Sequence, residues 1–187
     1  MDFSFYFTEG INHIADFSAY DHMLFVTVLC AAYSIKEWRK VLVLLTAFTI
    51  GHCITLILAG LEILQLPQDL IETLIPITIF ISAVANLVLN NKKVKMFPRY
   101  LTAAFFGLIH GAGFSNFYRI MFADIDERVV LPLLGFNLGI EMGQIFIVLG
   151  YFALVFILSK ISKLQEKYIL YTVSVVGALV SLKMIFA

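Results

Sequence analysis

Four histidines are the residues of this sequence best suited to chemistry, because each lies in or beside a long apolar segment. His13 and His22 belong to the stretch GINHIADFSAYDHMLF at residues 10–25, whereas His52 and His110 each lie within a separate apolar run. Placing an ionisable side chain in a membrane costs about 2.5–3.5 kcal/mol on insertion scales, so such residues usually face a partner, a metal or a water-filled cavity. We therefore expect the four histidines to build one site.

Metal binding is the chemistry that this set favours. Imidazole and carboxylate groups together suit Zn²⁺, Ni²⁺ or Fe²⁺, although ligand type alone does not choose among these ions. Asp21 directly precedes His22, so one could bind a metal while the other orients a ligand; equally, the pair could cap a helix at the membrane surface. His52 and His110 lie beside glycines at matching depths, which favours a shared metal over separate hydrogen bonds between helices. Cys53 is a softer potential ligand beside them.

A polar stripe marks a later apolar segment. Asn137, Glu141 and Gln144 occur at positions i, i+4 and i+7, which places them on one helix face. Glu141 is a candidate metal ligand, and in a catalytic site both Glu141 and Asp21 could act as a general base. The alternative is that the stripe only binds one helix to another. Glu72 is a weaker candidate, because the helix dipole alone favours an acid in a first turn.

The composition excludes a water-soluble globule. Of 187 residues, 61% are hydrophobic and 14% are charged, whereas soluble chains average about 25% charged residues. The length fits a single domain over residues 1–187. Formal net charge is zero and no basic block occurs, so nucleic acid is not an expected partner. The expected partners are a metal ion and the lipid bilayer.

The apolar segments predict an all-α, polytopic transmembrane bundle. A helix needs about 20 apolar residues to cross the hydrocarbon core. Six spans meet this requirement, at about residues 17–35, 41–61, 71–89, 100–118, 133–159 and 168–186. The fifth region is too long for one upright span, and Pro132, Gly135 and Gly139 indicate a broken or tilted start.

Basic residues predict the orientation of the bundle. Lys36, Arg39 and Lys40 follow the first span, Lys92, Lys93, Lys95 and Arg99 follow the third, and Lys160, Lys163 and Lys167 follow the fifth. Because lysine and arginine are enriched in cytoplasmic loops, both termini are expected outside. The candidate site residues of five segments then fall in the middle-to-outer half of the bundle.

Five motifs together resemble the HupE/UreJ family of small bacterial membrane proteins. They are GINHIADFSAYDHMLF, TAFTIGHCITL, IETLIPITIFISAVAN, FFGLIHGAGF and GFNLGIEMGQ, spread over residues 10–150. The resemblance implies a nickel permease or metal-uptake accessory in the bacterial inner membrane. It carries the family's motif residues to His13, Asp21, His22, His52, Glu72, His110 and Glu141, with Asn137 and Gln144 beside the last. The chain departs from the family at Ala19, where glycine is usual, and at Cys53, where serine is usual.

Two functions remain open on this basis. The first is a permease or uptake accessory for a divalent transition metal, which the resemblance favours. The second is an intramembrane metalloenzyme of the hydrolase type, in which a bound metal activates water. The inner half of the bundle favours the enzyme, because it offers Cys30, Tyr33, Thr46 and Ser159 but no charge or histidine. Whether a second copy or an accessory subunit takes part is left open.

Overall fold

The computed structural model of the protein describes residues 3–17, 20–60, 63–64, 66–89, 95–122, 130–161 and 165–186. These residues form seven α-helices and one short 3-10 helix, and they contain no β-strand. The elements are α1 (Phe3–Ile14), α2 (Asp21–Ala31), η1 (Ile35–Glu37), α3 (Trp38–Gly60), α4 (Gln68–Leu89), α5 (Met96–Phe122), α6 (Val130–Ile161) and α7 (Glu166–Ile185). The predicted all-α fold is confirmed.

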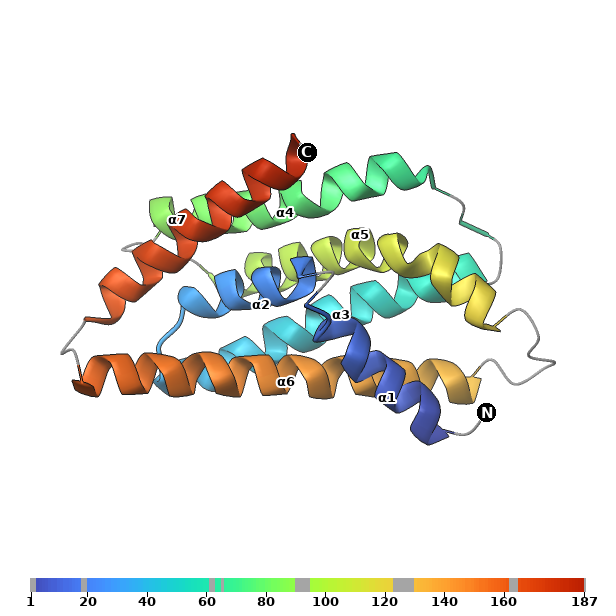
Figure 1. The fold of residues 1–187 in the computed structure, drawn as a ribbon, viewed down its shortest axis with the longest axis horizontal. Helices are drawn as coiled ribbons and strands as arrows, with labels where there is room; N and C mark the ends of the chain where they lie inside the picture. Colours follow the sequence, from blue (N-terminus) through green and yellow to red (C-terminus); the bar gives the residue numbers. More distant parts are fainter. Residues whose placement is uncertain are drawn as a thin grey trace.

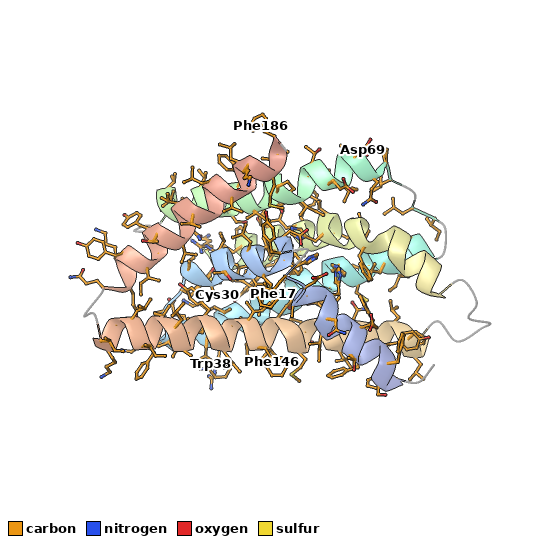
Figure 2. The ribbon with its side chains drawn as sticks, in the orientation of Figure 1. Phe17, Cys30, Trp38, Asp69, Phe146 and Phe186 are labelled. Carbon is orange, nitrogen blue, oxygen red and sulfur yellow. The ribbon has the colours of Figure 1, made fainter. Side chains whose placement is uncertain are left out.

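In the described part of the chain, four helical segments are long and apolar enough to cross a membrane: Ile35–Ala59, Gln68–Leu89, Leu131–Ile161 and Glu166–Ile185. Their outer faces carry large apolar side chains, such as Phe146 on α6, which is 57% exposed and points away from the bundle (Figure 2). Water-soluble proteins rarely leave a contiguous apolar surface uncovered. The chain is therefore a membrane protein, while the predicted total of six spans stays a prediction.

Three helix pairs surround one short central helix. The pairs with the most extensive contacts are α3 with α5, α1 with α6, and α4 with α7, and α2 packs against α4, α6 and α7 at their centre (Figure 1). Phe25, Val26, Val28 and Cys30 of α2 are each at most 1% exposed. A helix that is apolar all round is stable only when it is buried in this way.

The first predicted span, residues 17–35, differs from the structure. Its helix, α2, has only 11 residues, about 16 Å of rise, and a separate helix, α1, precedes it. The two helices meet near the middle of the bundle and diverge toward opposite ends (Figure 1). Irregular backbone at membrane depth is tolerated only where protein or a cavity covers it. Neither α1 nor α2, with 12 and 11 residues, is long enough to cross the hydrocarbon core alone.

The break expected at the start of the fifth span is absent, because α6 runs without interruption over 32 residues, whereas the tilt expected as the alternative stays a prediction. Pro132 lies in its first turn, where no backbone N–H is needed. The glycines serve packing instead. A Cβ atom at Gly139 would overlap the carbonyl oxygen of Phe7, and one at Gly10 would overlap that of Phe136. This close contact, together with the buried side chains of Tyr6 and Ile14, holds helix α1 against α6.

A second close contact joins α3 to α5. A Cβ atom at Gly51 would overlap the carbonyl oxygen of Ala104, and one at Gly107 would overlap that of Phe48. Small residues let the two backbones touch, which is a common device of membrane helices. The contact fixes the rotation of both helices, and so decides which side chains they turn toward α2.

Candidate metal site

Three histidines from three helices converge where α1 and α2 meet. His13 comes from the last turn of α1, His22 from the first turn of α2, and His52 from the middle of α3. Each offers one ring nitrogen, and these three nitrogens lie within 4.8 Å of one another. His22 and His52 are buried and His13 is half-buried. We call these three residues the histidine cluster.

His110 of α5 lies beside this cluster. Its ring centroid is 5.0 Å from that of His22, and a Cβ atom at the next residue, Gly111, would lie 2.5 Å from the carbonyl oxygen of His52. Because α3 and α5 touch at this glycine, His52 and His110 are held at the same level. The ring nitrogens of His110 are nevertheless outside the 4.8 Å group.

Asp21 fixes the tautomer of His22. Nδ1 of His22 lies 2.9 Å from Oδ1 of Asp21, and the same oxygen accepts the backbone N–H of His22 at 2.7 Å. A carboxylate can only accept here, so Nδ1 carries the proton and Nε2 keeps its lone pair. This carboxylate–histidine arrangement is the one that usually orients metal-bound imidazoles.

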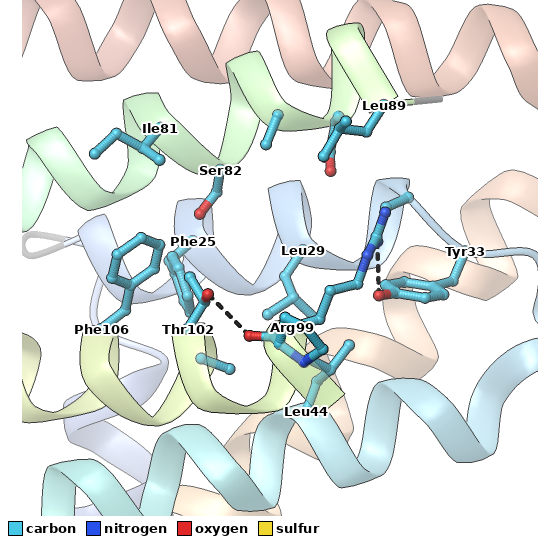
Figure 3. A pocket seen from close by; sticks show the side chains of 15 residues that line it. Phe25, Leu29, Tyr33, Leu44, Ile81, Ser82, Leu89, Arg99, Thr102 and Phe106 are labelled. Atoms are coloured by element: carbon cyan, nitrogen blue, oxygen red, sulfur yellow. Dashed lines mark hydrogen bonds between the residues drawn. The ribbon is translucent and has the colours of Figure 1, made fainter. Parts of the chain in front are cut away.

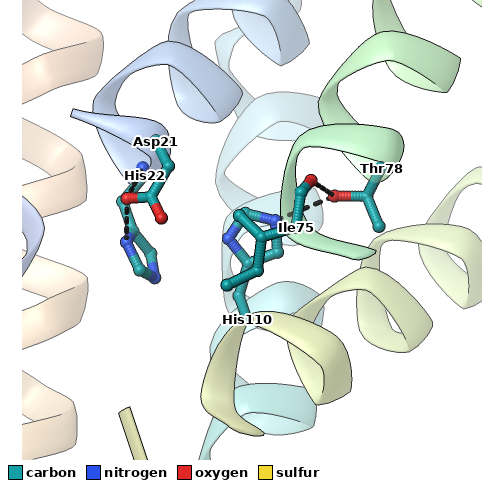
Figure 4. Close-up of polar contacts among 5 residues, drawn as sticks. All are labelled: Asp21, His22, Ile75, Thr78 and His110. Carbon is teal, nitrogen blue, oxygen red and sulfur yellow. Dashed lines mark hydrogen bonds and ion pairs between the residues drawn. The ribbon is translucent and has the colours of Figure 1, made fainter. Parts of the chain in front are cut away.

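Thr78 of α4 does the same for His110. Its hydroxyl donates to the carbonyl oxygen of Ile75 at 2.7 Å and lies 2.9 Å from Nε2 of His110 (Figure 4). Because the hydroxyl proton is already donated to Ile75, Nε2 of His110 must be the donor to Thr78. His110 therefore presents the lone pair of Nδ1. Thr78 was not a candidate in the sequence, where one threonine in an apolar helix gives no distinct signal.

The imidazole nitrogens are poorly satisfied by the protein itself. Nε2 of His13, Nε2 of His22, both ring nitrogens of His52 and Nδ1 of His110 are buried without a hydrogen-bond partner among the described residues. A buried unsatisfied polar group costs about 1–3 kcal/mol, so a set of this kind requires an explanation. Coordination to a transition-metal ion would satisfy one nitrogen of each residue. Three imidazoles are also a common ligand set for Zn²⁺ with one open position.

An acidic cavity of about 600 Å³ leads to the histidines. Four carboxylates line it: those of Glu9, Asp16, Asp21 and Glu72. Among the described residues, no lysine or arginine lines this cavity. Gln68 and Glu72 place its rim at the start of α4, and His13, His22 and His110 lie on its walls. A cleft lined by charge of one sign raises the local concentration of counter-ions. This cavity therefore favours cations.

Glu9 and Asp16 were not candidates on the basis of the sequence. A signal was present, since Glu9 lies four residues before His13 and Asp16 three residues after it. Residues three or four apart share a helix face. Glu9 could thus have been assigned to the side of α1 that carries His13, whereas Asp16 lies two residues beyond the end of this helix. What the sequence did not show was that α1 is a helix at all.

Aromatic rings close the bundle next to the histidines. The ring of Phe25 lies 5.0 Å from that of His110 and 4.9 Å from that of Phe48. Phe48 is itself 5.2 Å from His110, and Phe106 is 6.1 Å from Phe25. We call Phe25, Phe48 and Phe106 the aromatic layer. Phe25 and Phe106 also line a second cavity, so the layer separates the two cavities.

The structure does not bring Glu141 into the histidine cluster. Oγ1 of Thr46 donates to Oε1 of Glu141 at 2.7 Å, and Oγ1 of Thr49 donates to Oε1 of Gln144 at 3.0 Å. Thr46 lies six residues before His52 on α3, about 9 Å of helix rise. Two members of the predicted stripe thus bind α6 to α3, which is the structural alternative named above.

The remaining candidates lie at the margin of the site. Asn137 donates to the carbonyl oxygen of Leu133 on its own helix. Glu72 is exposed at the cavity rim and accepts a hydrogen bond from Gln68 at 3.1 Å. Cys53 is a half-buried free thiol and is not in the group of metal-ligating atoms found among the described residues.

Comparison with known proteins gives a match to a family over the whole chain. A family model described as HupE / UreJ protein matches residues 1–187, the whole chain. No curated protein and no solved structure matches the chain.

Proposed function

Because the chain belongs to the HupE/UreJ family, we propose that it is a permease or uptake accessory for a divalent transition metal ion. One observation carries the proposal: a cavity with four carboxylates and no basic residue among those described leads to three imidazole nitrogens within 4.8 Å of one another. The ion is the cargo, and the histidine cluster is where it is first bound without its water shell. The family resemblance puts nickel first, ahead of cobalt, zinc and iron.

The proposed binding step requires no conformational change. Carboxylates of the cavity concentrate hydrated cations near its floor. His13, His22 and His52 then replace water ligands, and Asp21 keeps Nε2 of His22 available throughout. Hard ions such as Mg²⁺ and Ca²⁺ prefer oxygen ligands, so imidazoles select against them.

Passage beyond the histidines requires the aromatic layer to open. Phe25 belongs to α2, the short half of an interrupted segment, and such discontinuous helices carry the ion sites of many transporters. A shift of α2 would move Phe25 and expose polar groups nearer the other end of the bundle. Glu141 accepts a hydrogen bond from Thr46 on that side, and Thr46 lies about 9 Å of α3 rise from His52. This hydrogen bond gives the path a polar step.

We place the cavity mouth on the outer side of a bacterial inner membrane. Lysine and arginine flank the opposite end of the bundle, and the positive-inside rule puts that end in the cytoplasm. With α1 and α2 counted as one interrupted crossing, the chain crosses six times and both termini lie outside.

The alternative function is an intramembrane metalloenzyme. The aromatic layer favours it, since a closed floor is no handicap to a metal that stays bound through turnover. Three histidine ligands leave a fourth position for a water molecule, which Zn²⁺ would activate. Asp21 is a poorer general base than expected from the sequence, because its Oδ1 is already used by His22.

Transport into proteoliposomes tests the proposal. The wild-type chain should take up Ni²⁺, Co²⁺ or Zn²⁺, and His52→Ala should lower the initial rate at least about tenfold, because it removes one of three ligands. Ser174→Ala is the matched control, since Ser174 is fully buried in α7. No uptake of any of the three ions, together with metal that survives prolonged chelation, would instead support the enzyme.

A further inference from the structure

A second cavity, of about 260 Å³, lies between α2, α4 and α5 at the basic end of the bundle. Phe25 and Phe106 line one end of it, and Tyr33, Leu89 and Arg99 line the other (Figure 3). It lies toward the opposite end of α4 from the acidic cavity, which Gln68 and Glu72 line. Most of its wall is apolar, from residues such as Leu29 and Leu44. It has no role in the binding step proposed above.

The polar side chains of this cavity turn their donors toward the backbone. Nδ2 of Asn86 donates to the carbonyl oxygen of Val28 at 2.7 Å, and Oγ of Ser82 donates to that of Thr78 at 2.8 Å. Thr102 likewise donates to its own helix, to Pro98 at 3.0 Å. With these groups satisfied, the interior suits hydrocarbon rather than a hydrated ion.

Arg99 is the exception, and it is the only charged residue among the described residues that line this cavity. One guanidinium nitrogen donates to the hydroxyl of Tyr33 at 2.8 Å, and the guanidinium carbon lies 5.5 Å from the centre of that ring. No carboxylate pairs with Arg99 among the described residues. A guanidinium held this way keeps further N–H groups for an anion that accepts two hydrogen bonds, such as a phosphate group.

The cavity also faces the bilayer. Ile81, on its edge, is 48% exposed, and Arg99 lies in the first turn of α5, at the end where the basic residues gather. An apolar space open to lipid, with one unpaired cation at its interfacial end, matches an amphiphile with an anionic head. The same cation would repel a metal ion, so this cavity does not suit cation exit.

We propose that this cavity holds an acyl chain of an acidic phospholipid, with the lipid phosphate bound by Arg99. Acidic lipids are attracted to basic residues at the cytoplasmic surface, and Tyr33 holds the arginine ready for them. The bound lipid fills the gap between α4 and α5 next to Phe25. The proposal does not depend on whether the chain transports its metal.

Native mass spectrometry of the full chain in nanodiscs tests this proposal. Phosphatidylglycerol and phosphatidylcholine with identical acyl chains are offered in equal amounts. We expect about a tenfold preference for phosphatidylglycerol, because both lipids offer a phosphate but the quaternary ammonium of phosphatidylcholine offsets its charge next to Arg99. Arg99→Gln should abolish this preference, and Arg99→Lys should retain part of it. Lys95→Gln, an exposed cation at the same end, should leave it unchanged.

Ala85→Phe supplies the second arm, because it fills the cavity without changing charge. It should reduce retention of both lipids, and Ile81→Trp should do so too if Ala85→Phe fails to fold. Equal losses in Arg99→Gln and Lys95→Gln would overturn the proposal, since they would show a diffuse basic surface. Full retention of lipid in the filled variants would overturn the proposal, because the lipid would then lie elsewhere. Displacement of the lipid by millimolar inorganic phosphate would also overturn it, because the site would then bind phosphate without an acyl chain.

Discussion

Oγ1 of Thr78 lies 2.9 Å from Nε2 of His110 and donates its own proton to the carbonyl oxygen of Ile75. This pair of contacts makes Thr78 an acceptor toward His110, and so leaves Nδ1 of His110 as the nitrogen with a lone pair. A threonine on one helix thereby sets the chemistry of a histidine on another.

Loss of this acceptor should weaken metal binding without removing a candidate ligand. We expect Thr78→Val to lower affinity for Ni²⁺ or Zn²⁺ by up to about tenfold, the low end of the usual effect of losing an orienting group, because His110 lies beside the three proposed ligands rather than among them. Thr78→Ser should restore it. Equilibrium dialysis of purified protein measures this, with Thr73→Val as control, because Thr73 makes a similar bond to its own helix but is exposed. Equal affinities in both valine variants would contradict a role for Thr78.

Asp21 should matter through its charge. In Asp21→Asn the side-chain oxygen can still accept a hydrogen bond from the Nδ1–H group of His22. Without its negative charge, however, it no longer strengthens that imidazole as a ligand. We expect metal affinity to fall about 10–100-fold, while Asp69→Asn, exposed at the start of α4, should bind as the wild type does. Both variants are compared by the same dialysis at one ionic strength. A wild-type affinity for Asp21→Asn would make this pair a simple helix cap.

Glu141 should not be a ligand of the histidine cluster. Glutamine keeps the oxygen that accepts the Thr46 hydroxyl, so Glu141→Gln should change metal occupancy by less than about twofold. Occupancy is measured by elemental analysis after a fixed dialysis, beside His52→Ala, which should lose most of its metal. If Glu141→Gln lost its metal as well, α6 would have to turn closer to the histidines than its contacts with α3 allow.

Two glycine substitutions should have opposite effects on stability. Gly107→Ala places a methyl group against the carbonyl of Phe48 and should destabilise the protein by about 1–3 kcal/mol or more. Gly150→Ala meets nothing within 4 Å and should stabilise α6 by roughly 0.5–1 kcal/mol. Thermal unfolding in detergent compares the two. A Gly107→Ala variant as stable as the wild type would show that α3 and α5 separate easily.

Topology is tested by labelling from both sides. In a background without Cys30 and Cys53, a cysteine at Gln68 should react with an impermeant maleimide added outside intact cells, and one at Lys95 should react only after lysis. The expectation follows from the basic residues that gather at the end of the bundle near Lys95. Reaction of both positions from the same side would refute six crossings with outer termini.

The sequence by itself determined that the chain is a membrane protein. It also determined which side chains could do chemistry in the membrane. These conclusions follow from composition and desolvation, which act on each residue type regardless of its neighbours. An imidazole in an apolar segment must find a partner wherever the chain folds, so His13, His22, His52 and His110 could be named in advance. The family resemblance rests on the same local motifs.

The tertiary structure alone decided how these groups are combined. Helix α1 packs against α6 where Gly10 meets Gly139, far along the chain, and buries Tyr6 and Ile14 there. The rotation of α6, set by the same packing, turned Glu141 toward Thr46 and away from the histidines. Thr78 and Phe25 acquired their places next to His110 only when α2, α4 and α5 came together. Side-chain direction depends on how helices rotate against each other, and that rotation is set by long-range packing.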